Sequence, residues 1–227
     1  MEDMYMNAYE AARMIDISTV RTQHTIKDIK EVVEIAKKYR FINVHALPCW
    51  VKELSGMLKA EKDIFVGSPV GFPGGGHRTE VKLLEAKYLV EDGVEEIDIV
   101  MNIGKLKNKE YDYVLEELKQ IITSIPENIL KKVIIEINCL TNEEVKKACE
   151  LVIESGADFV KTGTGWIPGK LDLERVRMIR EITRGKIKVK VAGGIRTKEE
   201  FEQMVEMGIE RFGINTKSAL EIVRSFE

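Results

Sequence analysis

Short runs rich in β-branched residues alternate along the chain with longer amphipathic stretches. In the first long stretch, Ile26, Ile29 and Val33 repeat at helical spacing, whereas Lys27 and Lys30 fall on the opposite face. The β-branched runs predict strands at Met14–Val20, Ile42–Leu47, Asp63–Phe72, Glu95–Met101, Lys132–Cys139, Phe159–Thr162, Ile187–Gly193 and Arg211–Ile214. The amphipathic stretches predict helices at Thr25–Tyr39, Val51–Lys59, Thr79–Glu91, Tyr111–Ile125, Asn142–Glu154, Leu173–Ile182, Lys198–Met207 and Lys217–Ser225. The pattern therefore predicts eight strand–helix pairs.

Residues that favour helix ends stand at the ends of several predicted helices. Threonine N-caps are expected at Thr25, Thr79, Thr141 and Thr197. Thr197 and Glu200 together fit a capping box. Glycines just beyond the last helical turn are expected at Gly93, Gly156 and Gly208.

Strict alternation of strands and helices predicts a parallel sheet, because each pair of parallel strands needs a crossover connection. Eight such units without a Pro-, Gly- or Ser-rich linker favour a single-domain α/β fold, a (β/α)8 TIM barrel over residues 1–227. A short helical segment is expected at residues 1–13. An open doubly wound sheet is the alternative, and the lack of a G-x-G-x-x-G motif after the first strand disfavours it.

Composition narrows the class of protein. The chain has 35 Lys and Arg against 38 Asp and Glu, a formal net charge of −3, which gives no reason to expect a nucleic-acid partner. No apolar run approaches the ~20 residues of a membrane span, and the first residues lack the basic-then-apolar order of a signal peptide. Cys49, Cys139 and Cys149 form no CxxC pair, as is typical of reduced thiols. We therefore expect a cytoplasmic protein that binds neither nucleic acid nor membrane.

Alternation along each strand separates inward polar side chains from the apolar ones that pack beneath the helices. If Ile15 and Ile17 face outward, Asp16 faces inward. The same rule predicts the inward side chains Asp16, Ser18, His45, Asp98, Glu136, Asn138, Lys161, Lys188 and Lys190. Lys, Asp and Glu are rarely buried without a partner. Any one of them could belong to a structural ion pair, but several inward lysines in one small barrel favour chemistry.

Two of these lysines suggest a specific reaction. An amine is nucleophilic only when neutral, so the pKa of Lys161 must fall by roughly three units from about 10.4 for it to act near neutral pH. A second ammonium about 4 Å away supplies roughly that much, and Lys190 stands on the next strand. Such a pair is the arrangement for Schiff-base formation with a carbonyl substrate. Asp98 could then move the protons that imine chemistry requires.

Glycine-rich turns follow the sixth, seventh and eighth predicted strands. Their backbone N–H groups allow a phosphate to approach closely, and barrels often bind phosphate after strands seven and eight. The predicted substrate- and phosphate-binding residues are Thr164, Gly165, Gly193, Gly194, Asn215, Thr216 and Asp16. The loop at 74–78 could add positive charge or be a plain turn. His24, His45 and His77 lack metal-ligand spacing, so we expect no metal.

In order and spacing, several segments resemble the deoxyribose-phosphate aldolases, a family of class I aldolases on the (β/α)8 barrel. The matching segments are 15–19, 70–73, 79–82, 96–104, 156–162, 189–197 and 211–213. The resemblance implies that Lys161 forms the Schiff base, that Lys190 is the second lysine and that Asp98 relays protons. It also implies phosphate binding by Gly165, Gly193 and Gly194. The implied reaction is reversible cleavage of 2-deoxy-D-ribose 5-phosphate to acetaldehyde and D-glyceraldehyde 3-phosphate, without a cofactor. We also expect a homodimer or homotetramer.

The chain departs from the family pattern around the substrate-contacting rim. The departures are Thr19-Val20-Arg21-Thr22 after strand one, His45 in place of a cysteine, His77 and Arg78 after strand three, Lys188 in place of a glycine, and Asn215-Thr216 in place of a Ser-Ser pair. Lys188 is expected to pair with Glu136 or Asp16. These departures leave open a Schiff-base aldolase for another phosphosugar or carbonyl donor, a non-catalytic phosphosugar-binding barrel, and an isomerase or synthase of the phosphate-binding barrel type.

Overall fold

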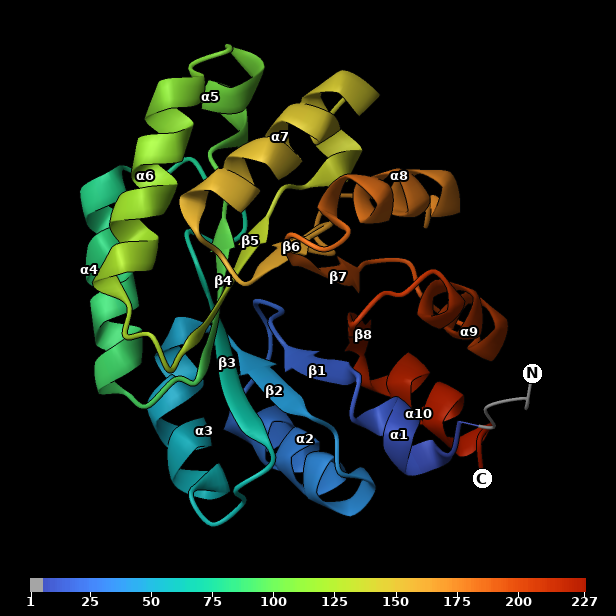
Figure 1. Cartoon of the computed structure of the whole chain (residues 1–227). Helices are drawn as coiled ribbons and strands as arrows, with labels where there is room; N and C mark the ends of the chain where they lie inside the picture. Colours follow the sequence, from blue (N-terminus) through green and yellow to red (C-terminus); the bar gives the residue numbers. More distant parts are fainter. Residues whose placement is uncertain (1–5) are drawn as a thin grey trace.

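The computed structural model describes residues 6–227, and it places eight parallel strands in a closed barrel that follows the order of the sequence (Figure 1). The strands are β1 (Ile15–Thr19), β2 (Asn43–Ala46), β3 (Phe65–Val70), β4 (Glu96–Val100), β5 (Leu130–Ile134), β6 (Phe159–Lys161), β7 (Lys188–Ala192) and β8 (Arg211–Asn215). The helices are α1 (Ala8–Ala12), α2 (Ile26–Tyr39), α3 (Val51–Leu58), α4 (Thr79–Glu91), α5 (Ile103–Lys107), α6 (Tyr111–Ser124), α7 (Asn142–Ser155), α8 (Leu173–Thr183), α9 (Lys198–Glu206) and α10 (Thr216–Arg224), with 3-10 turns η1 (Pro48–Trp50) and η2 (Ile137–Cys139). The predicted (β/α)8 barrel is confirmed.

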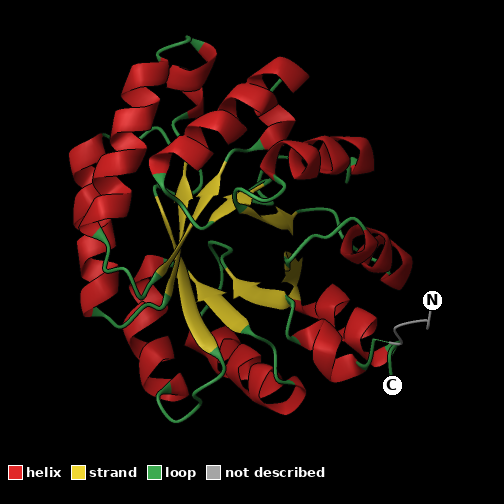
Figure 2. Cartoon of the chain, viewed as in Figure 1, coloured by secondary structure: helices red, strands yellow, loops and turns green. Residues whose placement is uncertain are grey.

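The helices form an outer layer around the strands (Figure 2), so the outward strand faces pack against helices. These faces carry the predicted apolar side chains, and each is at most 1% exposed: Ile15, Ile17, Val44, Ile97, Ile99, Val160, Val189 and Val191. Burial of apolar surface on this scale is the main source of stability in a barrel. The inward faces are left free for polar groups.

Most of the predicted helix ends are confirmed. Thr25, Thr141 and Thr197 are N-caps, and each forms a capping box with the acidic residue three positions later. Gly93, Gly156 and Gly208 all have positive φ angles, as predicted. Thr79 is not an N-cap, because Arg78 occupies that position and the Thr79 hydroxyl donates to Glu117 on α6 instead.

The fifth strand ends five residues earlier than predicted, at Ile134. The backbone of Glu136 adopts a φ of 47°, and the chain then enters η2 rather than continuing in the sheet. The inward position predicted for Asn138 is wrong for the same reason, since Asn138 lies exposed on η2. Helix α5 was not predicted, because its five residues are too few to show a helical repeat.

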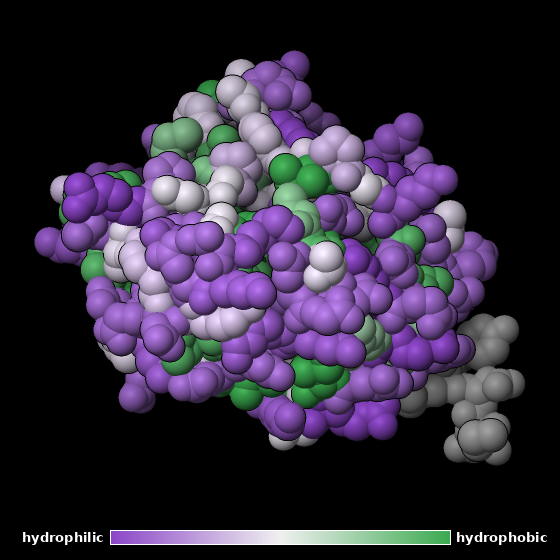
Figure 3. Space-filling model, turned by 90° about the horizontal axis from the view of Figure 1, so that it is seen from above, coloured by the Kyte–Doolittle hydropathy of each residue, from purple (hydrophilic) through white to green (hydrophobic). Residues whose placement is uncertain are grey.

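Within the segment 1–13 that was expected to be helical, α1 spans Ala8–Ala12, while residues 1–5 lie outside the described part of the chain. Helix α1 packs against α10. No helix in residues 6–227 is long and apolar enough to cross a membrane. The face of the molecule in Figure 3 is mostly hydrophilic, with small scattered apolar patches.

Candidate active site

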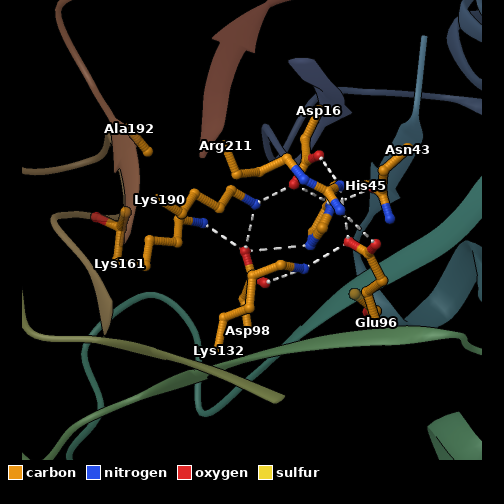
Figure 4. A network of polar contacts seen from close by, with 12 residues as sticks. Asp16, Asn43, His45, Glu96, Asp98, Lys132, Lys161, Lys190, Ala192 and Arg211 are labelled. Atoms are coloured by element: carbon orange, nitrogen blue, oxygen red, sulfur yellow. Dashed lines mark hydrogen bonds and ion pairs between the residues drawn. The ribbon is translucent and has the colours of Figure 1, made fainter. Parts of the chain in front are cut away.

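Asp98 on β4 lies at the centre of the polar groups inside the barrel (Figure 4). Its Oδ2 atom accepts hydrogen bonds from Lys161 Nζ at 2.7 Å and from Lys190 Nζ at 2.9 Å. The two lysines come from β6 and β7, where they stand directly opposite each other in the strand register. The three residues that were expected to carry imine chemistry are therefore in direct contact.

The pKa of Lys161 is lowered from its ordinary value of 10.5 to about 8. Burial is the largest cause, the positive charges of Lys190 and Lys132 add to it, and Asp98 opposes it. The prediction that Lys190 alone supplies the shift is therefore wrong about the main cause, although its sign is correct. A substantial fraction of the Lys161 amine is neutral at pH 8.

The carboxyl of Asp98 stays ionised despite full burial. Burial by itself would raise the pKa of Asp98, but the surrounding groups His45, Lys161 and Lys190 hold it well below its ordinary value. Asp98 can therefore accept a proton at neutral pH while it binds both amines.

A second layer of buried charges lies behind Lys190. Asp16 Oδ2 lies 2.5 Å from Lys190 Nζ, and Asp16 Oδ1 accepts from Arg211 Nη1 at 2.7 Å. Arg211 also binds Glu96 at 3.2 Å, and Glu96 accepts from Lys132 Nζ at 2.5 Å. All five side chains are at most 7% exposed. Each buried charge thus has a partner of opposite sign.

The charges of this cluster favour the loss of one proton from its basic side chains. Four basic side chains, Lys132, Lys161, Lys190 and Arg211, contact three carboxylates, those of Asp16, Glu96 and Asp98. With Lys161 neutral, three cations face three anions. An uncompensated buried charge is costly, so the balance favours the neutral form of one amine.

A cavity of about 380 Å³ opens above Lys161 and Lys190 at the carboxyl ends of the strands. It is lined by all seven residues predicted to bind substrate or phosphate: Asp16, Thr164, Gly165, Gly193, Gly194, Asn215 and Thr216. Gly193 and Gly194 have φ angles of 95° and 87°, a conformation that turns the backbone tightly beside the cavity. The cavity therefore joins the paired amines to the predicted phosphate-binding loops.

The comparisons with known proteins agree with this geometry. A family model described as DeoC/LacD family aldolase matches residues 22–215. The chain belongs to the DeoC/LacD aldolase family. It is 44% identical to a deoxyribose-phosphate aldolase of Sinorhizobium medicae over 95% of this chain and 86% of that protein. It is also 44% identical to a deoxyribose-phosphate aldolase of Thermococcus kodakarensis, over 96% of this chain and 97% of that one.

Solved structures of aldolases share the fold. The structure titled "QR15, an Aldolase" is 38% identical, has a TM-score of 0.88 and covers 100% of this chain and 96% of its own. The tetrameric deoxyribose phosphate aldolase of Aeropyrum pernix is 26% identical, has a TM-score of 0.87 and covers 97% of this chain and 92% of its own.

One further predicted position of this aldolase was wrong. Lys188 is the first residue of β7 and so lies at the end of the barrel where the strands begin. Its side chain is exposed there, with Nζ above the ring of Phe159. It pairs with neither Asp16, which Lys190 and Arg211 occupy, nor Glu136, whose carboxylate accepts from the Thr164 backbone at 3.0 Å. For the loop at 74–78, the alternative of a plain turn agrees with the structure, since His77 and Arg78 are exposed and do not line the cavity.

Within this buried cluster, sequence reasoning also missed three charges, Glu96, Lys132 and Arg211. The signal was present, because Glu96 shares a strand face with Asp98, and Arg211 lies at the start of the eighth strand, on the face shared by Gly213. The inward rule was not extended to the first residues of those strands.

Contacts between three loops bound the mouth of the aldolase cavity. Arg21 Nη2 donates to the carbonyl of Gly165 at 2.9 Å, and Trp166 Nε1 donates to the carbonyl of Val20 at 3.2 Å. The ring of Phe72 meets Trp166 edge-on at 5.5 Å. Arg21 was identified from the sequence as part of an altered rim. Trp166 was not identified, because its contacts with Val20 and Phe72 join residues far apart in the sequence.

The side chain of Asn215 has a local structural role as well as a place in the cavity wall. Its Oδ1 atom accepts from the backbone of Ser218 at 3.1 Å and so caps α10. Within residues 6–227, no group of three or more His, Cys, Asp or Glu side chains is arranged to hold a metal ion.

Proposed function

We propose that the protein is a class I aldolase that reversibly cleaves 2-deoxy-D-ribose 5-phosphate to acetaldehyde and D-glyceraldehyde 3-phosphate. The observation that carries this proposal is a lysine amine with a pKa of about 8, paired through Asp98 with a second lysine at the floor of a cavity. Relatives at 44% identity carry the name of this activity.

In the proposed mechanism, neutral Lys161 attacks the aldehyde carbon of the open-chain sugar. Loss of water gives a protonated imine, which accepts the electron pair when the bond between carbons 2 and 3 breaks. The proton of the carbon-3 hydroxyl leaves as glyceraldehyde 3-phosphate forms. The resulting enamine is protonated at carbon 2, and water releases acetaldehyde from Lys161. The protonated imine is the electron sink, so none of these steps requires a metal.

Asp98 is placed to move the protons of these steps. It contacts the reacting nitrogen of Lys161 directly, and its low pKa keeps it ionised at neutral pH, the form that can receive a proton. The positive charge of Lys190, which contacts Asp98 and Asp16, favours the neutral form of Lys161. Thr164 lines the cavity, and its hydroxyl contacts Glu136. We propose that Thr164 helps to position substrate and water.

We assign the sugar phosphate to the glycine-rich turns at the rim of the cavity. Gly165, Gly193 and Gly194 line the cavity, and the first turn of α10 begins beside it at Thr216. Backbone N–H groups at tight turns and helix N-termini favour anions. The phosphate would then lie at these turns, and the aldehyde end of the sugar would lie at Lys161.

Acetaldehyde release from 2-deoxyribose 5-phosphate tests the proposal, with ribose 5-phosphate and unphosphorylated deoxyribose as comparison substrates. We expect turnover by the natural protein, none by Lys161→Met, and near-normal turnover by the control Lys188→Met, since Lys188 lies outside the cavity. Turnover of another phosphosugar with Schiff-base formation would point instead to a relative with altered specificity. Ligand binding without any turnover would indicate a non-catalytic barrel.

We also propose that the protein assembles as a homodimer or homotetramer. A tetrameric structural neighbour supports assembly in this family. Light scattering of the purified protein gives the mass directly, and a monomer at enzyme-assay concentrations would overturn this part of the proposal.

A further inference from the structure

His45 is a third nitrogen-bearing group at the oxygen of Asp98 that both lysines share. It lies on β2, is 4% exposed and lines the cavity (Figure 4). Its Nε2 atom lies 3.1 Å from Asp98 Oδ2, while its Nδ1 atom contacts the side-chain amide of Asn43. The ring occupies space beside Gly67 that any side chain at that position would fill. The barrel is thus shaped to hold an imidazole here.

The surroundings of the ring decide which nitrogen carries its proton. With the Asn43 oxygen toward Nδ1, as the structure has it, both His45 Nε2 and Asn43 Nδ2 are buried without hydrogen-bond partners, although Nε2 lies 3.1 Å from Asp98 Oδ2. If Nδ1 donated to that oxygen, the lone pair of Nε2 would face a carboxylate. An asparagine amide can present either end, because its oxygen and nitrogen have nearly the same shape. With the Asn43 nitrogen donating to Nδ1, the proton belongs on Nε2, where it faces Asp98.

The charges around the ring favour a neutral imidazole. Burial lowers the pKa of His45, and the cation of Lys190 lowers it further. The carboxylates of Asp98 and of Asp16, whose Oδ2 lies 3.9 Å from Nδ1, act in the opposite direction without outweighing burial. Asn43 and Gly67, the other groups packed against the ring, carry no charge.

We propose that His45 is a positioning residue: held by Asn43 as the neutral tautomer protonated on Nε2, it presents that N–H to Asp98 Oδ2 and fixes the carboxylate during proton transfer. When Lys161 becomes an imine, it loses donors toward Asp98, and His45 continues to hold the same oxygen. The catalytic part of this inference rests on the proposed aldolase function, whereas the tautomer does not.

Nitrogen-15 NMR of the imidazole rings tests the tautomer without reference to activity. The chain has three histidines, so the signals of His45 can be assigned by their absence from the spectrum of His45→Gln. We expect the Nε2–H tautomer, neutral at pH 7. A ring protonated on Nδ1 alone, or a doubly protonated ring at pH 7, would overturn the proposal.

Kinetics test the positioning role. In His45→Leu, which fills the space but donates nothing, we expect kcat to fall by roughly tenfold or more with little change in KM. The pH at which kcat/KM rises should also be higher in this variant, because Asp98 then interacts more strongly with Lys161. His45→Gln offers an N–H at similar reach and should recover much of kcat. His77→Gln is the matched control at an exposed histidine outside the cavity.

Equal losses in the Leu and Gln variants with an unchanged pH profile would mean that His45 only fills space, and normal kcat in His45→Leu would mean that it has no role. Either result overturns the proposal. If the natural protein fails to turn over the deoxyribose ester, the proposed function fails, and the NMR result still decides the tautomer.

Discussion

At the scale of single residues, burial lowers the pKa of the Lys161 amine more than any one neighbour does. The side chain is almost fully buried and its pKa falls to about 8, with Lys190 and Lys132 adding to the effect and Asp98 opposing it. In the proposed mechanism Asp98 nevertheless has to be present, because proton transfer needs a base at this nitrogen. Asp98 therefore raises the pKa of Lys161, while burial and the neighbouring lysines lower it by more.

Removal of the Lys190 charge should make Lys161 more basic. In Lys190→Met, a cation that lowers the pKa of Lys161 is lost and Asp98 is freed to bind Lys161 more strongly, so that pKa rises above about 8. The pH at which imine formation reaches half its maximum should move upward by the same amount. Lys188→Met, two residues away on the same strand, removes an equal charge from an exposed position and should leave the profile in place.

At the scale of helices and strands, a buried ion pair joins α4 to α6. Lys82 Nζ donates to Glu117 Oε1 at 2.7 Å and to the carbonyl of Val100 at 2.9 Å, and both charged side chains are at most 1% exposed. Thr79 donates to the other oxygen of Glu117 at 3.0 Å. The hydroxyl that the sequence assigned to a helix cap is used in this contact between helices.

Lys82→Met should destabilise the protein by about 3–5 kcal/mol, because it leaves the carboxylate of Glu117 buried without its partner. The double variant Lys82→Met/Glu117→Gln should recover a large part of that loss, since the remaining side chain is neutral and can still accept from Thr79. Urea unfolding of the natural protein and both variants measures the differences. A double variant less stable than Lys82→Met would contradict this explanation.

Local patterns were sufficient for elements whose ends depend on near neighbours. Thr197 and Glu200 form the predicted capping box within one helical turn. Thr79 fails as a predicted cap because its hydroxyl contacts a helix more than thirty residues away. The end of β5 was mispredicted for a similar reason: the backbone turns at Glu136, whose carboxylate binds Thr164 on the loop after β6.

At the scale of the whole molecule, the alternation of eight strand–helix pairs was enough to predict the barrel and the inward faces of Asp98, Lys161 and Lys190. Depth along the barrel axis was not predictable, because alternation sets the direction of a side chain but not its distance from the open ends. Lys188 and Lys190 point the same way, yet only Lys190 is buried. The partners of each charge depend on strand register, which a single sequence does not reveal.

The buried carboxylates also predict how stability depends on pH. Asp16 and Asp98 have pKa values far below 3.8 in the folded state, so between those values and 3.8 the unfolded chain binds more protons. Their contribution to stability is therefore complete above about pH 4 and is lost as the pH falls below it. Urea unfolding should give a free energy that falls gently as the pH drops below about 6.5, where the unfolded chain protonates His45 before the folded one does, and falls steeply below about 4. A protein equally stable at pH 3 and 7 would contradict this prediction.

The measurement that tests the account most directly is borohydride reduction in the presence of 2-deoxyribose 5-phosphate or acetaldehyde, followed by peptide mapping. Reduction converts a Schiff base into a stable secondary amine at the lysine that formed it. The account predicts a single adduct on Lys161, with trapping that increases as the pH rises through about 8. An adduct on Lys190 or on an exposed lysine, or no adduct from a preparation that releases acetaldehyde, would contradict it.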